Sequence, residues 1–402
     1  MKLTALLGAN QVLSHGFGVF LFAALFPFMR DDLGLTYWHL SAVGIATQLA
    51  YLAGAMSIGL LGRILPAEKL ILLSAAASSG LLFSLAVLLQ PVLMIMVLAL
   101  LAFSAAVCWG SIVGIITRYV PADRAASSLS AAGSGTAWGY GVNGLLLLFW
   151  VPLLGWQITW MVTAAAGVFV LLLSLFMLRS LQGLPDVALV SPQVERSPGV
   201  LSTRKLFRAL LTEQRAALSC AIYFLIGFTC ITFSGWLNTY LDELGQTSLA
   251  GPTWTILGVS GMLAGAGIGR LADKKGHATA MLVMALGYAV SLAVFSYDPV
   301  EYAFIAGIGY GLIYFPVWGI LASWVSQVYS PVATMQLSGL GMVASALGGS
   351  SGNFVAGLIQ TTTGSLEMLY LLLASGSGVL LALALIMLWQ QKQRSEQYEP
   401  CL

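Results

Sequence analysis

The chain is a succession of long apolar runs separated by short polar turns, and this pattern restricts its fold more than any other feature. Hydrophobic residues make up 59% and charged residues 8% of the 402 residues, whereas ordinary soluble domains carry about a quarter charged residues. A soluble chain of this length could not bury so much apolar surface, so we expect the runs to lie in lipid. They are continuous and lack the alternation of barrel strands, which favours helices of about 20 residues.

Twelve runs are long enough to cross a membrane, six on each side of one polar segment. They are 4–29, 37–62, 70–90, 92–117, 127–150, 158–179, 218–241, 249–270, 278–297, 302–325, 333–360 and 368–390. The predicted fold is all-α and integral to the membrane, with 12 transmembrane helices arranged as two six-helix bundles. The expected division is an N-terminal bundle at 1–179, a cytoplasmic linker at 180–217, a C-terminal bundle at 218–390 and a cytoplasmic tail at 391–402.

The distribution of cations predicts the orientation. Placing both termini inside puts 16 of the 17 Lys and Arg residues in cytoplasmic segments and leaves only Arg30 outside, as the positive-inside rule requires. We therefore expect a multi-pass protein of the cytoplasmic membrane. Arg30 is expected to pair with the adjacent Asp31 and Asp32, or else to attract anions at the outer mouth.

Several classes of function are disfavoured by composition. A net charge of +2 without a basic patch gives nucleic acid nothing to bind. The four cysteines are Cys108, Cys220, Cys230 and Cys401. They show no paired spacing, so neither a metal site nor a disulfide framework is expected. An enzyme would need a buried nucleophile, acid–base pair or metal cluster, which three scattered histidines and the absence of mid-span carboxylates do not supply. We expect no cofactor.

Matching residues recur at a near-constant separation in the two halves. Gly62-Arg63 and Gly269-Arg270 are 207 positions apart, and four later pairs are each 210 apart. These pairs are Tyr119 and Tyr329, Pro121 and Pro331, Gly139 and Gly349, and Asn143 and Asn353. The regularity indicates two homologous halves.

The turn after the eighth run carries the most specific motif. Its sequence, GRLADKKGH from Gly269 to His277, resembles the cytoplasmic signature G-x-L-a-D-r-x-G-r of the major facilitator superfamily of transporters. The copy at Gly59 to Lys69 departs from it, since the central Asp and second Gly are missing. The resemblance implies two bundles that rock about a central site, with this turn as a gating latch formed by Gly269, Arg270, Asp273, Lys274 and Gly276. The alternative is that the cations of this turn only hold it on the cytoplasmic side, as the positive-inside rule describes, and have no gating role. We expect Asp273→Asn to disturb the conformational balance more than a change at Glu68.

No Asp, Glu, Lys or Arg lies near the middle of any run, which makes His15 the most informative polar residue. Gln11, Ser14, His15 and Gly18 share one helical face by their spacing, and such a face should meet protein or water. Histidine titrates near neutrality, so His15 could carry a coupled proton or meet a substrate. A neutral histidine bonded to a neighbouring span is the alternative.

Other polar and aromatic side chains complete the candidate site. Gln48 and Tyr51, and the pair Tyr310 and Tyr314, could either contact a substrate or hold helices together. The candidate substrate-binding residues are Gln11, His15, Gln48, Tyr51, Ser111, Trp138, Asn143, Asn238, Tyr310 and Tyr314. Their chemistry suits a neutral, zwitterionic or weakly acidic solute.

The function predicted is a secondary active transporter that moves a small organic solute by alternating access, with or without coupling to protons. A multidrug or metabolite efflux pump of the same fold and a non-transporting membrane receptor are the alternatives. The expected partners are the solute and the lipid bilayer, without nucleic acid, and the expected state is a monomer.

Overall fold

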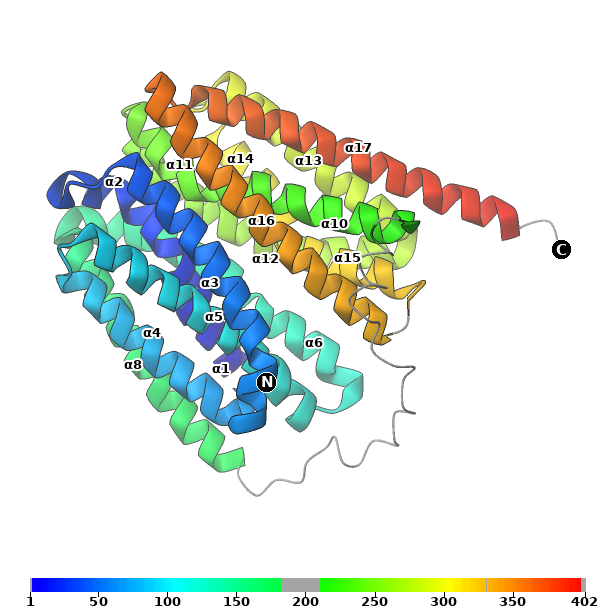
Figure 1. The fold of residues 1–402 in the computed structure, drawn as a ribbon, viewed down its shortest axis with the longest axis horizontal. Coiled ribbons are helices and arrows are strands. Elements are labelled where there is room, and N and C mark those ends of the chain that lie inside the picture. Colours follow the sequence, from blue (N-terminus) through cyan, green and yellow to red (C-terminus); the bar gives the residue numbers. More distant parts are fainter. Residues whose placement is uncertain (1, 182–209, 211, 330, 399–402) are drawn as a thin grey trace. The chain divides into compact units, whose positions relative to one another are not determined.

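The computed structural model describes residues 2–181, 210, 212–329 and 331–398, and all of the regular structure in these residues is helical (Figure 1). The first elements are α1 (Lys2–Gln11), the π-helix η1 (Val12–Phe20), α2 (Leu21–Leu33), α3 (Tyr37–Ile64), α4 (Ala67–Val87), α5 (Pro91–Tyr119), α6 (Ala122–Gly133), α7 (Gly135–Leu145), the π-helix η2 (Leu146–Trp150) and α8 (Val151–Leu181). The remaining elements are α10 (Gln214–Ile226), the π-helix η4 (Gly227–Ile231), α11 (Thr232–Glu243), the 3₁₀ turn η5 (Thr247–Leu249), α12 (Ala250–Lys275), α13 (His277–Tyr297), α14 (Ala303–Tyr314), α15 (Val317–Ser326), α16 (Pro331–Thr363) and α17 (Glu367–Tyr398).

Eleven helical stretches in the described residues are long and apolar enough to cross a membrane, and one of them accounts for two spans. This stretch, Ser127–Arg179, has 53 residues, which at 1.5 Å per residue is more than twice the thickness of a hydrocarbon core. Gly155 interrupts it with φ 78° and ψ 174°, a conformation that glycine adopts without a steric penalty. The chain turns there, and the predicted count of 12 transmembrane helices is confirmed.

The predicted runs agree with the helices in number and order, but spans 1, 5, 7 and 10 have internal structure that hydrophobicity does not predict. The first span is α1, η1 and α2 in succession, so its middle is a π-helix. The tenth span is two helices, α14 and α15, which meet around Pro316; a proline lacks the N–H that would continue the ladder. The predicted linker at 180–217 falls mostly outside the described residues, as do the last four residues of the predicted tail.

The chain forms two compact units. Unit 1 consists of Met1–Val194 together with Gly235–Gly258, and unit 2 consists of Glu195–Ser234 together with Val259–Leu402. The segment Gly235–Gly258, which we call the 235–258 hairpin, contains most of α11, η5 and the start of α12. The end of the seventh span and the start of the eighth thus group with the N-terminal spans.

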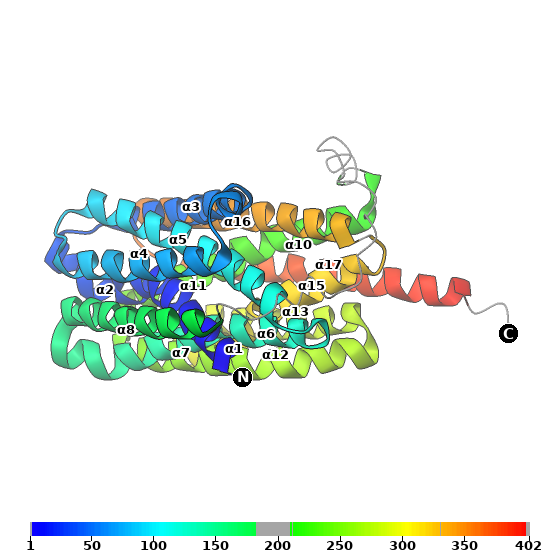
Figure 2. The same ribbon diagram turned by 90° about the horizontal axis from the view of Figure 1, so that it is seen from below.

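Within each unit, corresponding spans pack against each other. In unit 1, α4 packs against α5 and α8, and α7 packs against η1; the α4–α8 pair is visible in both ribbon views (Figures 1 and 2). In unit 2, α13 packs against α14 and α17, and α10 and η4 pack against α16. Numbered as spans, the pairs 3–4, 3–6 and 1–5 of the first half recur as 9–10, 9–12 and 7–11. The same packing scheme therefore occurs twice, as the repeated residues suggest.

Glycines allow close backbone contacts between spans 1 and 5 and between spans 7 and 11. A Cβ added to Gly16 in η1 would lie 2.6 Å from the Cα of Gly139 in α7. A Cβ added to Gly227, the first residue of η4, would lie 2.0 Å from the carbonyl oxygen of Ser345 in α16. Small residues that let backbones touch are the usual means of helix association in lipid. Both contacts involve a π-helix, whose wider turn displaces the backbone locally.

Candidate functional site

A chain of three hydrogen-bonding side chains lies in unit 1 and centres on His15. Ser14 Oγ is 3.1 Å from His15 Nδ1, and His15 Nε2 is 3.1 Å from the Tyr51 hydroxyl. The rings of His15 and Tyr51 meet edge to face, with centroids 5.5 Å apart. Spans 1 and 2 supply these groups through η1 and α3.

The chemistry of this chain permits more than one proton arrangement. A neutral imidazole has one N–H donor and one acceptor nitrogen, and a hydroxyl can take either role. Both ring nitrogens of His15 face hydroxyls, so either tautomer is satisfied if Ser14 and Tyr51 rotate their O–H bonds. His15 is nearly buried, with 7% of its surface exposed. The arrangement can hold an imidazole in the span, and it can pass a proton between the two hydroxyls.

Gln11 lies one helical turn before His15 and links span 1 to span 5. Its Nε2 donates to Thr136 Oγ1 at 3.1 Å, while its Oε1 is buried without a hydrogen-bond partner among the described residues. Thr136 was not among the predicted site residues. Its position could have identified it, because Thr136 is the one threonine within the glycine-rich stretch GSGTAWGYG. Gln48 is half-buried, one turn from Tyr51 on α3.

Three other predicted residues of unit 1 occupy different surroundings. Asn143 is fully buried and donates from Nδ2 to the Gly16 carbonyl oxygen at 2.8 Å, which ties α7 to the π-helix. Ser111 is buried, and its hydroxyl donates to the Val107 carbonyl oxygen of its own helix. Trp138 is 55% exposed. The structure brings Gln11, His15 and Tyr51 together, and it gives Asn143 and Ser111 backbone partners.

Asn238 belongs to the 235–258 hairpin and is fully buried in unit 1. Its Nδ2 donates to the Ala24 carbonyl oxygen at 2.7 Å, and its Oδ1 accepts from Trp254 Nε1 at 2.8 Å. Both ends of the amide are thus occupied by protein groups.

The predicted residues of unit 2 lie in a cluster of rings. Tyr310 stacks on Phe233 with centroids 5.7 Å apart and contacts Tyr314 at 4.9 Å. Trp318 meets Tyr314 edge to face and stacks on Tyr223 at 5.4 Å. Tyr310 is fully buried, and its hydroxyl lies 3.4 Å from Ser234 Oγ. The four-residue spacing on span 10 therefore produces a continuous cluster of packed rings within unit 2.

The signature turn connects α12 and α13. Gly276 has φ 90°, a conformation that favours glycine and ends α12. Arg270, Asp273 and Lys274 are exposed. In the weaker N-terminal copy, Glu68 accepts hydrogen bonds from the Tyr119 hydroxyl at 2.6 Å and from Arg118 Nη1 at 3.1 Å.

A model of the Major Facilitator Superfamily matches residues 11–353 of the chain. The chain belongs to the major facilitator superfamily. The protein is accordingly a multi-pass membrane protein and a secondary transporter of small solutes. A comparison with curated proteins found no match.

Solved structures agree with the assignment of the fold. A crystal structure of a mutant of the nucleoside transporter NupG superposes with a TM-score of 0.74, at 18% identity, covering 96% of this chain and 99% of that one. A second NupG structure gives 0.72 with the same identity and coverage. At this level of identity the likeness shows a shared fold.

Proposed function

We propose that this transporter moves a small, polar and largely uncharged organic solute across the cytoplasmic membrane by alternating access, and that proton binding at His15 is coupled to transport. The observation that carries the proposal is the Ser14–His15–Tyr51 chain. It places a titratable ring within a span, between two groups that can accept or supply its proton. Intramembrane ionisable groups are rare and are commonly functional.

The chemistry of the side chains around His15 supports an uncharged solute. Gln11, Gln48 and Tyr51 offer amide and hydroxyl groups, and no Asp, Glu, Lys or Arg lies near the middle of any span. Aromatic rings such as those of Tyr310 and Tyr314 suit a planar or ring-containing solute, although both rings are buried against protein in this structure. Nucleosides combine a flat heterocycle with hydroxyl groups, and NupG is named as a nucleoside transporter. They are therefore the first solutes to test.

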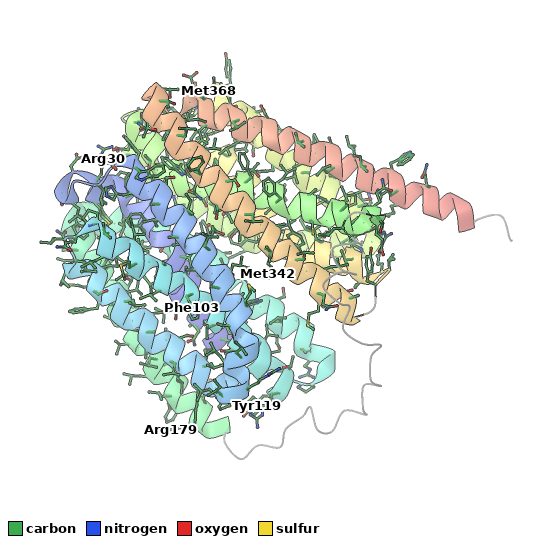
Figure 3. The ribbon with its side chains drawn as sticks, in the orientation of Figure 1. Arg30, Phe103, Tyr119, Arg179, Met342 and Met368 are labelled. Carbon is green, nitrogen blue, oxygen red and sulfur yellow. The ribbon has the colours of Figure 1, made fainter. Side chains whose placement is uncertain are left out.

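The distribution of cations supports an orientation with both termini in the cytoplasm. In this orientation the end of unit 1 that contains Arg30 faces outside, and the end that contains Tyr119 faces inside. Figure 3 shows these two residues at opposite ends of the unit 1 helices. We further propose that the protein acts as a monomer.

The test is uptake by purified protein in liposomes, measured with a panel of labelled nucleosides, sugars and amino acids under an imposed pH gradient. We expect one class to accumulate with the gradient. His15→Ala should abolish the response to the gradient, whereas His15→Gln should keep binding but lose coupling, because an amide forms hydrogen bonds and does not titrate.

A matched control is Ile226→Val, since Ile226 directly precedes the close-contact glycine of span 7 as His15 precedes that of span 1. It should leave the pH dependence unchanged. Normal, pH-dependent transport by His15→Ala would rule out the coupling role, and the absence of transport for every solute would rule out the proposed solute class.

A further inference from the structure

We propose that Cys108 is a positioning residue for His15. Acting through Ser14, its thiol holds the imidazole as the tautomer that carries its hydrogen on Nδ1. The coupled proton is then taken up at Nε2, the ring nitrogen that faces Tyr51. This inference rests on the coupling role of His15 proposed above, and all of the groups that carry it lie within unit 1.

The hydrogen-bonded chain of the site continues beyond Ser14. The Ser14 hydroxyl is hydrogen-bonded to the Cys108 thiol of α5, and Cys108 Sγ donates to the backbone carbonyl oxygen of Asn10 in α1 at 3.8 Å. Ser14 and Cys108 are 2% and 1% exposed. Cys108 otherwise belongs to a cluster of buried apolar residues. The full chain therefore runs, in order, through Tyr51, His15, Ser14, Cys108 and the Asn10 carbonyl.

The number of hydrogens in this chain matches the number of its links. As neutral groups, the four side chains bring one hydrogen each, whereas the backbone carbonyl at the end can only accept. There are four links between neighbouring groups. The Tyr51 hydroxyl has no other hydrogen-bond partner among the described residues, so its hydrogen must be used within the chain.

Every hydrogen is used only if all four bonds point toward Asn10. Tyr51 then donates to His15 Nε2, and His15 Nδ1 donates to Ser14 Oγ. Ser14 in turn donates to Cys108, whose thiol donates to Asn10. In the other tautomer Nε2 donates to Tyr51, which leaves the hydroxyl hydrogen of Tyr51 without an acceptor and the link from Ser14 to Cys108 without a hydrogen. These losses favour the Nδ1–H tautomer by about tenfold.

The tautomer decides which nitrogen of His15 can take up a proton. In a neutral imidazole this is the nitrogen without a hydrogen, and the hydrogen bond of the other nitrogen selects it. Tyr51 and Cys108 are the titratable groups of the chain on α3 and α5. None of the elements packed on η1, which are α1, α2, α4, α5, α7 and α8, has a charged residue outside its terminal turns. Hydrogen bonds and not a fixed charge therefore make the selection.

The experiment determines which ring nitrogen carries the hydrogen, by ¹⁵N NMR of the protein in liposomes with labelled imidazole rings, at a pH where the ring is neutral. His39→Gln and His277→Gln leave His15 as the single labelled ring. In this background we expect Nδ1–H to exceed Nε2–H by about tenfold. Cys108→Ala should make the two populations nearly equal, because Ser14 loses its acceptor and either tautomer then leaves one hydroxyl hydrogen unused.

Three further variants separate the role of the thiol from that of its volume. Cys108→Ser should keep the parent ratio, since a hydroxyl can accept from Ser14 and donate to Asn10 as the thiol does. Cys220→Ala is the matched control, because it removes a free thiol of unit 2 that is not part of the chain; it should also keep the parent ratio. If Cys108→Ala cannot be purified, Ser14→Ala decides, since it interrupts the same chain and should equalise the tautomers as well.

Transport gives a second readout. When the population of the Nδ1–H tautomer falls to about half, uptake driven by a pH gradient should fall by about twofold. This loss is expected in Cys108→Ala and not in Cys108→Ser. Exchange of solute at equal pH on both sides should be unchanged in both variants, because it requires no net movement of protons.

The proposal is overturned if Nε2–H dominates in the parent, or if Cys108→Ala keeps the parent ratio, as a thiol that serves only packing would. The NMR readout does not depend on knowing the solute. A ratio that responds to Cys108→Ala in a protein whose uptake is unaffected by His15→Ala would keep the positioning role and reject proton coupling. An unchanged ratio in a protein whose gradient response requires His15 would do the reverse.

Discussion

Spans 1 and 7 occupy equivalent places in the two halves, and comparing them separates what the duplication preserved from what it changed. Each contains a π-helix, η1 and η4, and each presses a glycine backbone onto the partner span, α7 or α16. The side chains beside these contacts differ. Span 1 carries the Ser14–His15–Tyr51 chain, whereas the cluster around span 7 consists of Phe233, Tyr223 and Tyr310.

The difference indicates that the backbone contacts serve helix packing in both halves, whereas the side chains beside them have diverged. Close helix contact serves both bundles, because helices in lipid associate through packing and not through a hydrophobic driving force. Proton chemistry needs to be present only once. In the proposed function the polar role falls to the first half, whereas the second half contributes packed aromatic rings.

The largest expected effect comes from the shared feature. Gly16→Ala and Gly227→Ala should each lower the melting temperature in detergent by several degrees and reduce transport strongly, because a methyl group at either position would overlap backbone atoms. Overpacking of this kind costs about 1–3 kcal/mol. Thermal unfolding of the purified variants measures it.

The matched controls are Gly59→Ala and Gly319→Ala, where an added Cβ meets no atom within 4 Å. Both should melt like the parent protein. If only one of Gly16→Ala and Gly227→Ala is destabilised, the two backbone contacts are not equivalent. The claim that both halves depend on the same close helix contact is then wrong.

A smaller effect tests the divergence of the side chains. Tyr51→Phe removes the hydroxyl that faces His15 Nε2 and should reduce transport by about fivefold, since one net hydrogen bond is worth about 1 kcal/mol. Tyr310→Phe keeps the ring that stacks on Phe233 and loses only a long contact to Ser234, so a change of less than about twofold is expected. Initial rates of uptake at saturating solute compare the two. A greater loss for Tyr310→Phe would show that unit 2 supplies polar recognition as well.

Most of the fold could be predicted from the sequence, because transmembrane helices are specified by the length of apolar runs and by cations at their ends. The π-helix at Val12–Phe20 could not, and neither could the close approach of its Gly16 to Gly139, which is a contact between spans. The partners of the candidate site residues could be predicted less well. Spacing identified the Gln11, Ser14 and His15 face but could not tell that Asn238 would be held by Ala24 and Trp254. Sequence patterns show which face of a helix a residue lies on, and the partner on another span is a tertiary fact.

The smallest expected effect concerns the two signature turns. Here the second half contains the complete motif, but the acidic residue of the first half has the more extensive contacts. The complete motif contains the exposed Asp273, which forms no ion pair within the described part of the chain, while the incomplete copy contains Glu68 with two partners. Glu68→Gln should therefore lower the melting temperature by about one or two degrees, a modest change because Arg118 is 44% exposed and solvent screens the pair.

Asp273→Asn should leave the melting temperature unchanged and alter the ratio of solute exchange to net uptake, because its effect is expected on the balance between conformations and not on the stability of this one. Tyr119→Phe is the control for Glu68→Gln, since it removes one of the two donors and should give about half of the shift. Equal melting shifts at Glu68 and Asp273, together with equal changes in exchange, would show that the two turns have the same role. The degraded sequence of the first copy would then carry no functional meaning, and the asymmetry of the halves would be confined to the side chains around His15.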